Sequence, residues 1–243
     1  MALMQAKHAT FCGGQVIFDA ALGSFDPRFF LVDHWRGAGS LARAGAGRGA
    51  SWFIDSDQGQ WVLRHYRRGG KAAWLSQDRY FYTGLSRTRA FAEWRLLCEL
   101  TNRGLPVPRP VAARVERSGM TYRADLITAT IANAQTLSER LSAATLEPQL
   151  MAAVGHCIGR FHAAGVWHAD LNAHNVLLDH NDIVYLIDFD RGRLRRGTRW
   201  RKRNLQRLHR SLCKLQRQKD GAAFDATAWS ALLSAYRKYL QRL

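Results

Sequence analysis

Four polar residues in the second half of the chain constrain its fold more than any other feature of the sequence. His168, Asp170 and Asn175 stand in the order H-x-D-L-x-x-x-N, and Asp188 follows in the sequence I-D-F-D. An apolar, strand-like run follows Asn175, and a second one precedes Asp188. This pattern predicts two short strands joined by a turn. Such a hairpin would bring Asn175 and Asp188 to the same edge.

The residue types in this stretch are those needed for phosphoryl transfer to a hydroxyl group, and their layout is that of a kinase catalytic loop. Asp170 can accept a hydrogen bond from the acceptor hydroxyl and take its proton, as a catalytic base. The side-chain oxygens of Asn175 and Asp188 are hard ligands of the kind that Mg²⁺ prefers. We expect His168 to brace the loop by hydrogen bonding rather than to react.

A glycine-rich segment in the first half of the chain is the candidate phosphate loop. Gly45, Gly47 and Gly49 alternate just before a strand-like run at residues 51–54. Glycines allow backbone amides to approach phosphate oxygens closely. A turn then leads to a second predicted strand, at residues 61–66, so the two strands would form a hairpin over a nucleotide.

Arg64 occupies the position where protein kinases carry a lysine that pairs with phosphates and with a glutamate on the next helix. The next predicted helix spans residues 88–103, and Gly104 ends it. Glu93 lies in the first turns of this helix and is the natural partner for Arg64. An exposed strand arginine and a glutamate placed favourably near a helix N-terminus are the alternative interpretations.

The residues after this helix contain a predicted boundary between two parts of the chain. The segment L-P-V-P-R-P stops the helix and predicts an edge-like strand, followed by a hairpin at residues 111–117 and 121–127. Residues 128–134 have the small, polar character of a hinge, which places a boundary near residue 130. Beyond it, helices are predicted at residues 137–141 and from Pro148 to the catalytic loop.

Longer stretches of the sequence resemble one family of kinases. The run F-H-x-x-G-V-x-H-x-D-L-x-x-x-N-V-L-L with I-D-F-D is similar to the protein-kinase-like superfamily, and Asp190 in place of Gly is similar to its small-molecule and antibiotic kinases. The segments H-A-D-L-N-A-H-N-V-L-L, V-L-R-H-Y-R-R-G-G, D-R-Y, T-R-A-F-x-E and G-L-P-V-P-R-P resemble the 3-deoxy-D-manno-octulosonic acid (Kdo) kinases of Gram-negative bacteria. The matches extend from about Gly45 to Arg193.

The resemblance implies an α+β, bilobal protein-kinase-like fold. A small antiparallel-sheet lobe would span residues 1–130, and a mainly helical lobe would span residues 131–243. The implied activity is ATP-dependent phosphorylation, at the 4-hydroxyl, of the Kdo residue of a lipid A precursor in lipopolysaccharide biosynthesis. The resemblance makes Asp170 the catalytic base and makes Asn175 and Asp188 the Mg²⁺ ligands.

The net charge of +17 implies a polyanionic partner or substrate. Thirteen Lys and Arg residues and no acid lie between Arg191 and Lys219. Within this stretch, leucines recur at helical spacing, which predicts an amphipathic helix with a cationic face at residues 204–218. The functional interpretation is contact with anionic lipid headgroups or lipid A phosphates, which suffices for reversible docking. The resemblance implies that this peripheral docking takes place on the cytoplasmic side of the inner membrane. The alternative is a solvated charged face. A last helix is predicted at residues 225–243.

Two other functions stay open. A soluble kinase of an antibiotic or other small molecule would use the same catalytic residues, but its acceptor would not require so many cations. A basic nucleic-acid-binding protein would explain the arginine-rich helix but not the metal-ligand spacing. We therefore expect no nucleic-acid partner, and no obligate protein partner is evident from the sequence.

The cysteines and apolar runs favour a protein of a reducing compartment without a membrane span. The four cysteines are scattered and form no C-x-x-C pair, which favours free thiols over a zinc site or a disulfide framework. No stretch reaches the ~18 uninterrupted apolar residues of a transmembrane helix. The N-terminus lacks a basic segment leading into an apolar run, so we expect no signal peptide.

Overall fold

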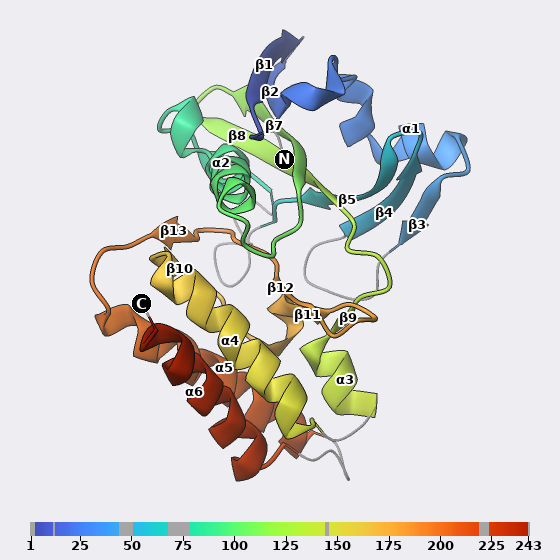
Figure 1. Ribbon diagram of the computed structural model, residues 1–243. Coiled ribbons are helices and arrows are strands. Elements are labelled where there is room, and N and C mark those ends of the chain that lie inside the picture. Colours follow the sequence, from blue (N-terminus) through green and yellow to red (C-terminus); the bar gives the residue numbers. More distant parts are fainter. Residues whose placement is uncertain are drawn as a thin grey trace. The chain divides into compact units, whose positions relative to one another are not determined.

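The computed structural model describes residues 3–11, 13–43, 51–67, 78–143, 146–218 and 224–242. They belong to two compact units: Met1–Arg103 with Pro108–Thr130, and Gly104–Val107 with Ile131–Leu243. Helices and antiparallel strands are both present, so the α+β class is confirmed at that level (Figure 1).

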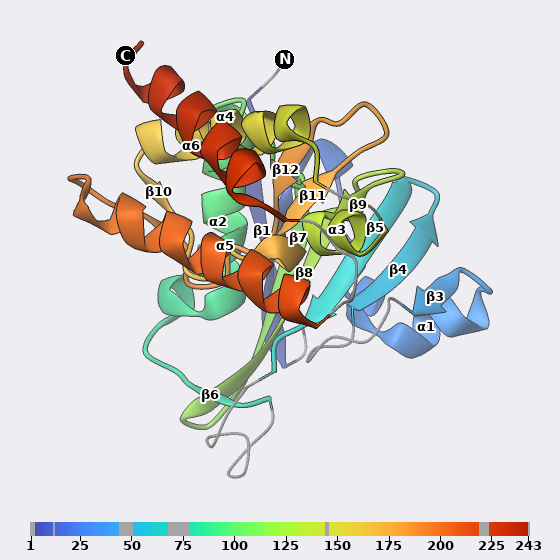
Figure 2. The same ribbon diagram turned by 90° about the horizontal axis from the view of Figure 1, so that it is seen from below.

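The first unit is built on one antiparallel sheet. Its strand order is β1-β2-β7-β8-β5-β4-β3, with β6 paired to β8, and the strands β3, β4 and β5 are seen side by side in Figure 2. The strands are β1 (Ala6–Phe11), β2 (Gly14–Asp19), β3 (Leu41–Arg43), β4 (Ser51–Ser56), β5 (Gly59–His65), β6 (Tyr80–Phe81), β7 (Pro110–Ser118) and β8 (Thr121–Ala129).

Helix α2 (Arg89–Asn102) packs on this sheet next to β7 and β8. Phe91, Trp94, Leu97 and Leu100 recur at helical spacing, and each is almost fully buried. Gly104 follows the helix with a φ of 67°, in the left-handed region that favours glycine. The helix predicted at residues 88–103 is therefore confirmed, with its end where the glycine indicated.

Three features of the first unit differ from the sequence predictions. The strand after L-P-V-P-R-P was expected at an edge, but β7 lies between β2 and β8 in the sheet. Its Pro110 is the first residue of the strand, next to an irregularity in the register, so its missing N–H disrupts little of the ladder. Strand β1 and the short helix α1 (Val32–Gly37) were not predicted, because they are short and carry no clear period.

The second unit contains four helices and three small strand pairs among its described residues. Its strands are β9 (Gln135–Thr136), β10 (Val166–Trp167), β11 (Val176–Leu178), β12 (Val184–Leu186) and β13 (Arg193–Leu194). β11 pairs with both β12 and β9, and β10 pairs with β13, all antiparallel. Its helices are α3 (Leu137–Ala143), α4 (Pro148–Ala163), α5 (Arg199–Arg217) and α6 (Ala226–Leu240). The predicted basic helix starts earlier than expected, at Arg199.

Helices α4 and α6 pack closely along their length (Figure 1). Gly155 of α4 makes this approach possible, because a Cβ built there would lie 2.1 Å from the backbone oxygen of Leu232 in α6. His162, near the end of α4, is buried and bonds through Nδ1 to the Tyr236 hydroxyl at 2.9 Å. α4 leads through Gly165 and β10 into the segment that holds Asp170.

Candidate active site

The β11–β12 hairpin holds two of the predicted site residues at one end. Asn175 directly precedes β11, and Asp188 lies two residues after β12. Val176 is paired with Leu186, and the Ile187 amide donates to the Asn175 carbonyl oxygen at 3.1 Å. The structure therefore confirms the predicted hairpin and the prediction that Asn175 and Asp188 share its edge.

Asp170 is tied to the same place through Asn175. The Nδ2 of Asn175 donates to the main-chain oxygen of Asp170 at 2.9 Å. The side chain of Asn172 caps the intervening turn by accepting from the His174 amide at 2.8 Å, while its own Nδ2 donates to the Asp170 oxygen at 3.0 Å. These bonds fix the loop that carries the carboxylate of Asp170.

His168 braces this loop, as predicted. Its Nε2 donates to the main-chain oxygen of Ile187 at 2.8 Å, and its Nδ1 accepts from the Asp170 amide at 3.1 Å. The amide can only donate, so Nδ1 must be unprotonated and the imidazole neutral. Burial lowers the pKa of His168, and this favours the same neutral form. One buried ring thus links the residue before Asp188 to Asp170.

Asp188 adopts an uncommon backbone conformation. Its φ is 61°, in the left-handed region that only a few per cent of non-glycine residues occupy. Such conformations cost about 1–3 kcal/mol and cluster at functional sites, where the surrounding structure enforces them. The short strand β12 and the His168 bond to Ile187 are the enforcing elements here.

The residues present fit a magnesium ion. The Nδ2 of Asn175 is used for the Asp170 oxygen, which leaves Oδ1 as the atom that can bind a metal. Asp188 supplies a carboxylate on the same edge. In the described ranges no group of three or more His, Cys, Asp or Glu side chains is gathered to hold a metal. Mg²⁺ commonly needs only one or two protein carboxylates, because substrate phosphates and water complete its octahedron.

Helix α5 contributes three residues to this site that sequence reasoning missed. Asn204 is buried, and its side chain bonds to both the amide and the carbonyl of His168, at 3.2 and 2.8 Å. Ser211 accepts from the Ala173 amide at 3.2 Å. Arg207 donates from Nε to the Asp170 carboxylate at 2.7 Å and also forms an ion pair with it.

These three α5 residues had a detectable signal in the sequence. They are spaced by three and four positions, so they lie on one face of the helix beside its leucine stripe. The interpretation of the stretch as a charged surface helix overlooked Asn204, an amide among cations. The basic helix is therefore part of the site as well as a charged surface.

Arg64 and Glu93, in the first unit, form the ion pair predicted from the sequence. Nη2 of Arg64 lies 2.5 Å from Oε1 of Glu93, whose side chain is 2% exposed. The Tyr66 hydroxyl donates to the other carboxylate oxygen, so both oxygens of Glu93 are bonded. Whether Arg64 contacts phosphate stays a prediction. Gly45, Gly47 and Gly49 lie outside the described residues.

Two further findings concern membrane spans and cysteines in the part of the chain that the structure describes. None of its helices combines the length and the hydropathy that a transmembrane span requires. Cys98, Cys157 and Cys213 are free thiols, while Cys12 lies outside the part that the structure describes. Burial raises the pKa of Cys157 to about 12, so this thiol stays protonated at neutral pH.

Comparisons with known proteins point to one family. The family described as "Lipopolysaccharide kinase (Kdo/WaaP) family" matches residues 32–236. A protein of Xanthomonas axonopodis pv. citri, named 3-deoxy-D-manno-octulosonic acid kinase, is 49% identical over 205 residues, covering 84% of this chain and 82% of the relative. A protein of the same name from Photobacterium profundum is 40% identical over 223 residues, covering 91% and 94%. The chain therefore belongs to the lipopolysaccharide kinase (Kdo/WaaP) family.

Proposed function

We propose that this protein transfers the γ-phosphate of ATP to the 4-hydroxyl of the Kdo residue of a lipid A precursor, in lipopolysaccharide core biosynthesis. Membership in a family of lipopolysaccharide kinases makes the chain a phosphotransferase. The names of its relatives give Kdo as their acceptor. The single observation that carries the proposal is that Asp170, Asn175 and Asp188 are tied to one end of the β11–β12 hairpin.

In this reaction, the side chains have separate tasks. The Asp170 carboxylate would accept a hydrogen bond from the acceptor hydroxyl and orient the lone pair of the hydroxyl oxygen toward the γ-phosphorus. It would take the proton as the new O–P bond forms, while the bond from the γ-phosphorus to the bridging oxygen breaks and ADP leaves. Asn175 and Asp188 would hold Mg²⁺, which supplies charge neutralisation for the transferred phosphoryl group. His168 and Asn204 do not react, and they keep the carboxylate in place.

Residues of the first unit would position the nucleotide. Glu93 holds Arg64 by an ion pair, so the guanidinium is fixed before any ligand arrives. We assign Arg64 to the ATP phosphates together with the Gly45, Gly47 and Gly49 loop. A guanidinium is a planar fork of donors, so it would contact two phosphate oxygens where a lysine contacts one.

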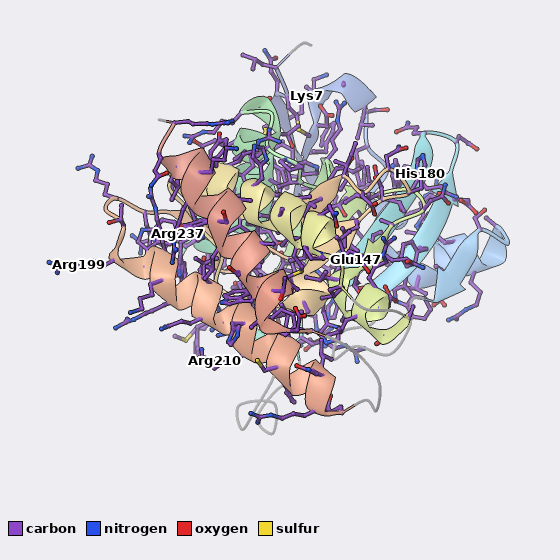
Figure 3. All side chains as sticks on the ribbon, turned by 60° about the horizontal axis from the view of Figure 1, so that its bottom comes forward. Lys7, Glu147, His180, Arg199, Arg210 and Arg237 are labelled. Atoms are coloured by element: carbon purple, nitrogen blue, oxygen red, sulfur yellow. The ribbon has the colours of Figure 1, made fainter. Side chains whose placement is uncertain are left out.

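We also propose that the protein binds peripherally to the cytoplasmic face of the inner membrane. The cationic surface of α5 supports this, since each basic residue near an anionic surface contributes about 1 kcal/mol before screening. Arg199 and Arg210 extend from this helix in Figure 3. Sedimentation with anionic vesicles, at low and high salt, is the measurement, and salt-independent or absent binding would argue against it.

The test of the activity is incubation with labelled ATP, Mg²⁺ and a panel of lipid A precursors with and without Kdo. We expect label only in Kdo-bearing acceptors, with the mass of one added phosphate, and fragmentation should place it on the 4-hydroxyl. Transfer to an aminoglycoside but to no Kdo acceptor would support the soluble small-molecule kinase instead.

A further inference from the structure

A pocket of about 490 Å³ lies beside the catalytic loop, within the second unit. Trp167 and Ala169, which precede Asp170, form one side of it, and α5 forms the other. Four arginines are among the residues that line it: Arg195, Arg203, Arg207 and Arg210. The function proposed above gives these arginines no role in the reaction.

Three of these arginines form no salt bridge within the described part of the chain: Arg195, Arg203 and Arg210. No acid occurs in the sequence between Arg191 and Lys219. Guanidinium groups gathered around one cavity repel one another, and an anion relieves that repulsion. The pocket therefore has the electrostatic character of an anion site.

Arg207 joins the pocket to the catalytic carboxylate. It lines the cavity and also donates to Asp170. A molecule with its anionic group in this pocket would lie directly next to Asp170. This adjacency suits an acceptor whose negative charge is on the same sugar as the reacting hydroxyl.

Arg195 is held in place before a ligand arrives. Its guanidinium carbon lies 3.9 Å from the centre of the Trp167 ring, and its amide donates to the Gly165 oxygen at 2.8 Å. β10 and β13 pair through Val166 with Leu194 and Trp167 with Arg193, so this arm of the pocket is anchored to the start of the catalytic loop. Pre-organised donors lose less entropy on binding.

We propose that this pocket binds the carboxylate of the acceptor sugar acid, with Arg195, Arg203 and Arg210 as specificity-determining residues. The inference rests on the proposed function, because it takes Kdo as the acceptor. An octulosonic acid carries its carboxylate on the sugar that is phosphorylated. Guanidinium groups recognise carboxylates by paired, charge-assisted hydrogen bonds. A phosphate of the lipid A portion has similar chemistry and is the other possible source of the anion.

Steady-state kinetics of Arg203→Gln and Arg210→Gln provide the first test. Both side chains are exposed, so their replacement leaves the fold intact. We expect the KM for the Kdo acceptor to rise about tenfold in each variant, as for the loss of one charged hydrogen bond. The KM for ATP should change less than about twofold, and Arg203→Lys should recover part of the loss.

Arg237→Gln and Lys238→Gln, on α6, are the controls. Both side chains are exposed and lie outside the pocket, and each replacement removes one positive charge, as Arg203→Gln and Arg210→Gln do. The controls should leave the acceptor KM within about twofold of the wild type, whereas a general charge effect would raise it in all variants. Equal rises in all four variants would overturn the proposal.

Calorimetric binding of deacylated acceptors, without ATP, identifies the anion and separates this proposal from the proposed function. A methyl ester at the Kdo carboxylate should weaken binding to the wild type about tenfold and abolish the difference between wild type and Arg203→Gln. If the ester has no effect, and removal of the lipid A phosphates instead weakens binding and abolishes the difference between wild type and Arg203→Gln, the carboxylate assignment is overturned. Arginine-dependent binding without any phosphate transfer would instead overturn the proposed function and leave the pocket intact.

Discussion

Arginines are arranged in opposite ways in the first unit and on α5. In the first unit, arginines reach carboxylates, as in the pairs Arg64–Glu93, Arg109–Asp19, Arg114–Asp125 and Arg123–Asp78. On α5, Arg207 is the one described basic residue with a carboxylate partner, and that partner is Asp170. The contrast indicates that the first unit compensates these arginines internally, whereas α5 leaves its other cations without a carboxylate in the described part of the chain.

The histidines of the two units also differ, in the direction in which their pKa values are shifted. His65 in the first unit bonds to Asp125 at 2.7 Å, and this bond raises the pKa of the imidazole. In the second unit, burial lowers the pKa of His162 to about 3 and also lowers that of His168. Positive charge on the imidazole is thus stabilised at His65 of the first unit and disfavoured at His162 and His168 of the second.

Among the predicted changes in the free energy of unfolding, that of Glu93→Ala is the largest for a single substitution. This substitution leaves the guanidinium of Arg64 and the hydroxyl of Tyr66 without the carboxylate that both contact. We expect a loss of about 3 kcal/mol in the free energy of unfolding of the first unit, since removing one partner of a buried pair is strongly destabilising. Urea denaturation without nucleotide measures this loss.

Glu99→Ala on the same helix is the control for that prediction. Glu99 pairs with Arg103 across one helical turn, and both side chains are about two-fifths exposed. Such pairs contribute about 0.5 kcal/mol or less. A similar loss of unfolding free energy in both variants would contradict the view that the buried Arg64–Glu93 pair stabilises the first unit more than an exposed pair does.

Asn204→Ala tests the attachment of α5 to the catalytic loop. It removes two bonds to the His168 backbone in a buried place, at a cost of about 2 kcal/mol in unfolding free energy. Turnover should fall while the KM for ATP stays nearly unchanged, because Asp170 loses its position. Ser211→Ala, which removes one bond to the Ala173 amide, should cost less. A fully active Asn204→Ala enzyme would show that this attachment has no part in catalysis.

The pH dependence of stability separates the contributions of the histidines in the two units. His162 and His168 are neutral when folded, whereas the unfolded chain takes up their protons below a pKa of 6.5. Stability should therefore fall as the pH drops below 6.5, by up to about 1.4 kcal/mol per pH unit for each ring. The contribution of His65 has the opposite sign, being complete below 6.5 and lost as pH rises through its raised pKa.

Urea unfolding at several pH values between 5 and 8 would resolve these contributions. His162→Gln should flatten the acidic side of the profile, and His65→Gln should flatten the basic side. A wild-type profile with no fall between pH 6.5 and 5 would contradict the buried, neutral state of the second unit's histidines.

Sequence reasoning succeeded where a motif of reactive residues and the hydrophobic period of the same short stretch indicate the same structure. The motif and its spacing predicted the β11–β12 hairpin and the bracing by His168, because a period-two pattern and a loop histidine act within a short stretch. The Arg64–Glu93 pair was predicted from its resemblance to a kinase pair, not from packing.

Sequence reasoning failed where a feature depends on contacts between residues that are distant in the sequence. The bond from Arg207 to Asp170 joins residues far apart in the sequence, and a charge run gives no sign of which cation turns inward. The central place of β7 depends on β2, a strand from the unpatterned start of the chain. The predicted metal ligation, base role and nucleotide contacts stay predictions.

Turnover and Mn²⁺–ATP binding, measured together on Asp170→Asn and Asp188→Ala, test the central claim most directly. For Asp170→Asn we expect turnover to fall by about 10²–10⁴-fold, the usual contribution of a general base, with metal–nucleotide binding unchanged. For Asp188→Ala we expect both to be lost. Near-normal turnover in both variants, with folded protein, would contradict the assignment of these carboxylates to phosphoryl transfer.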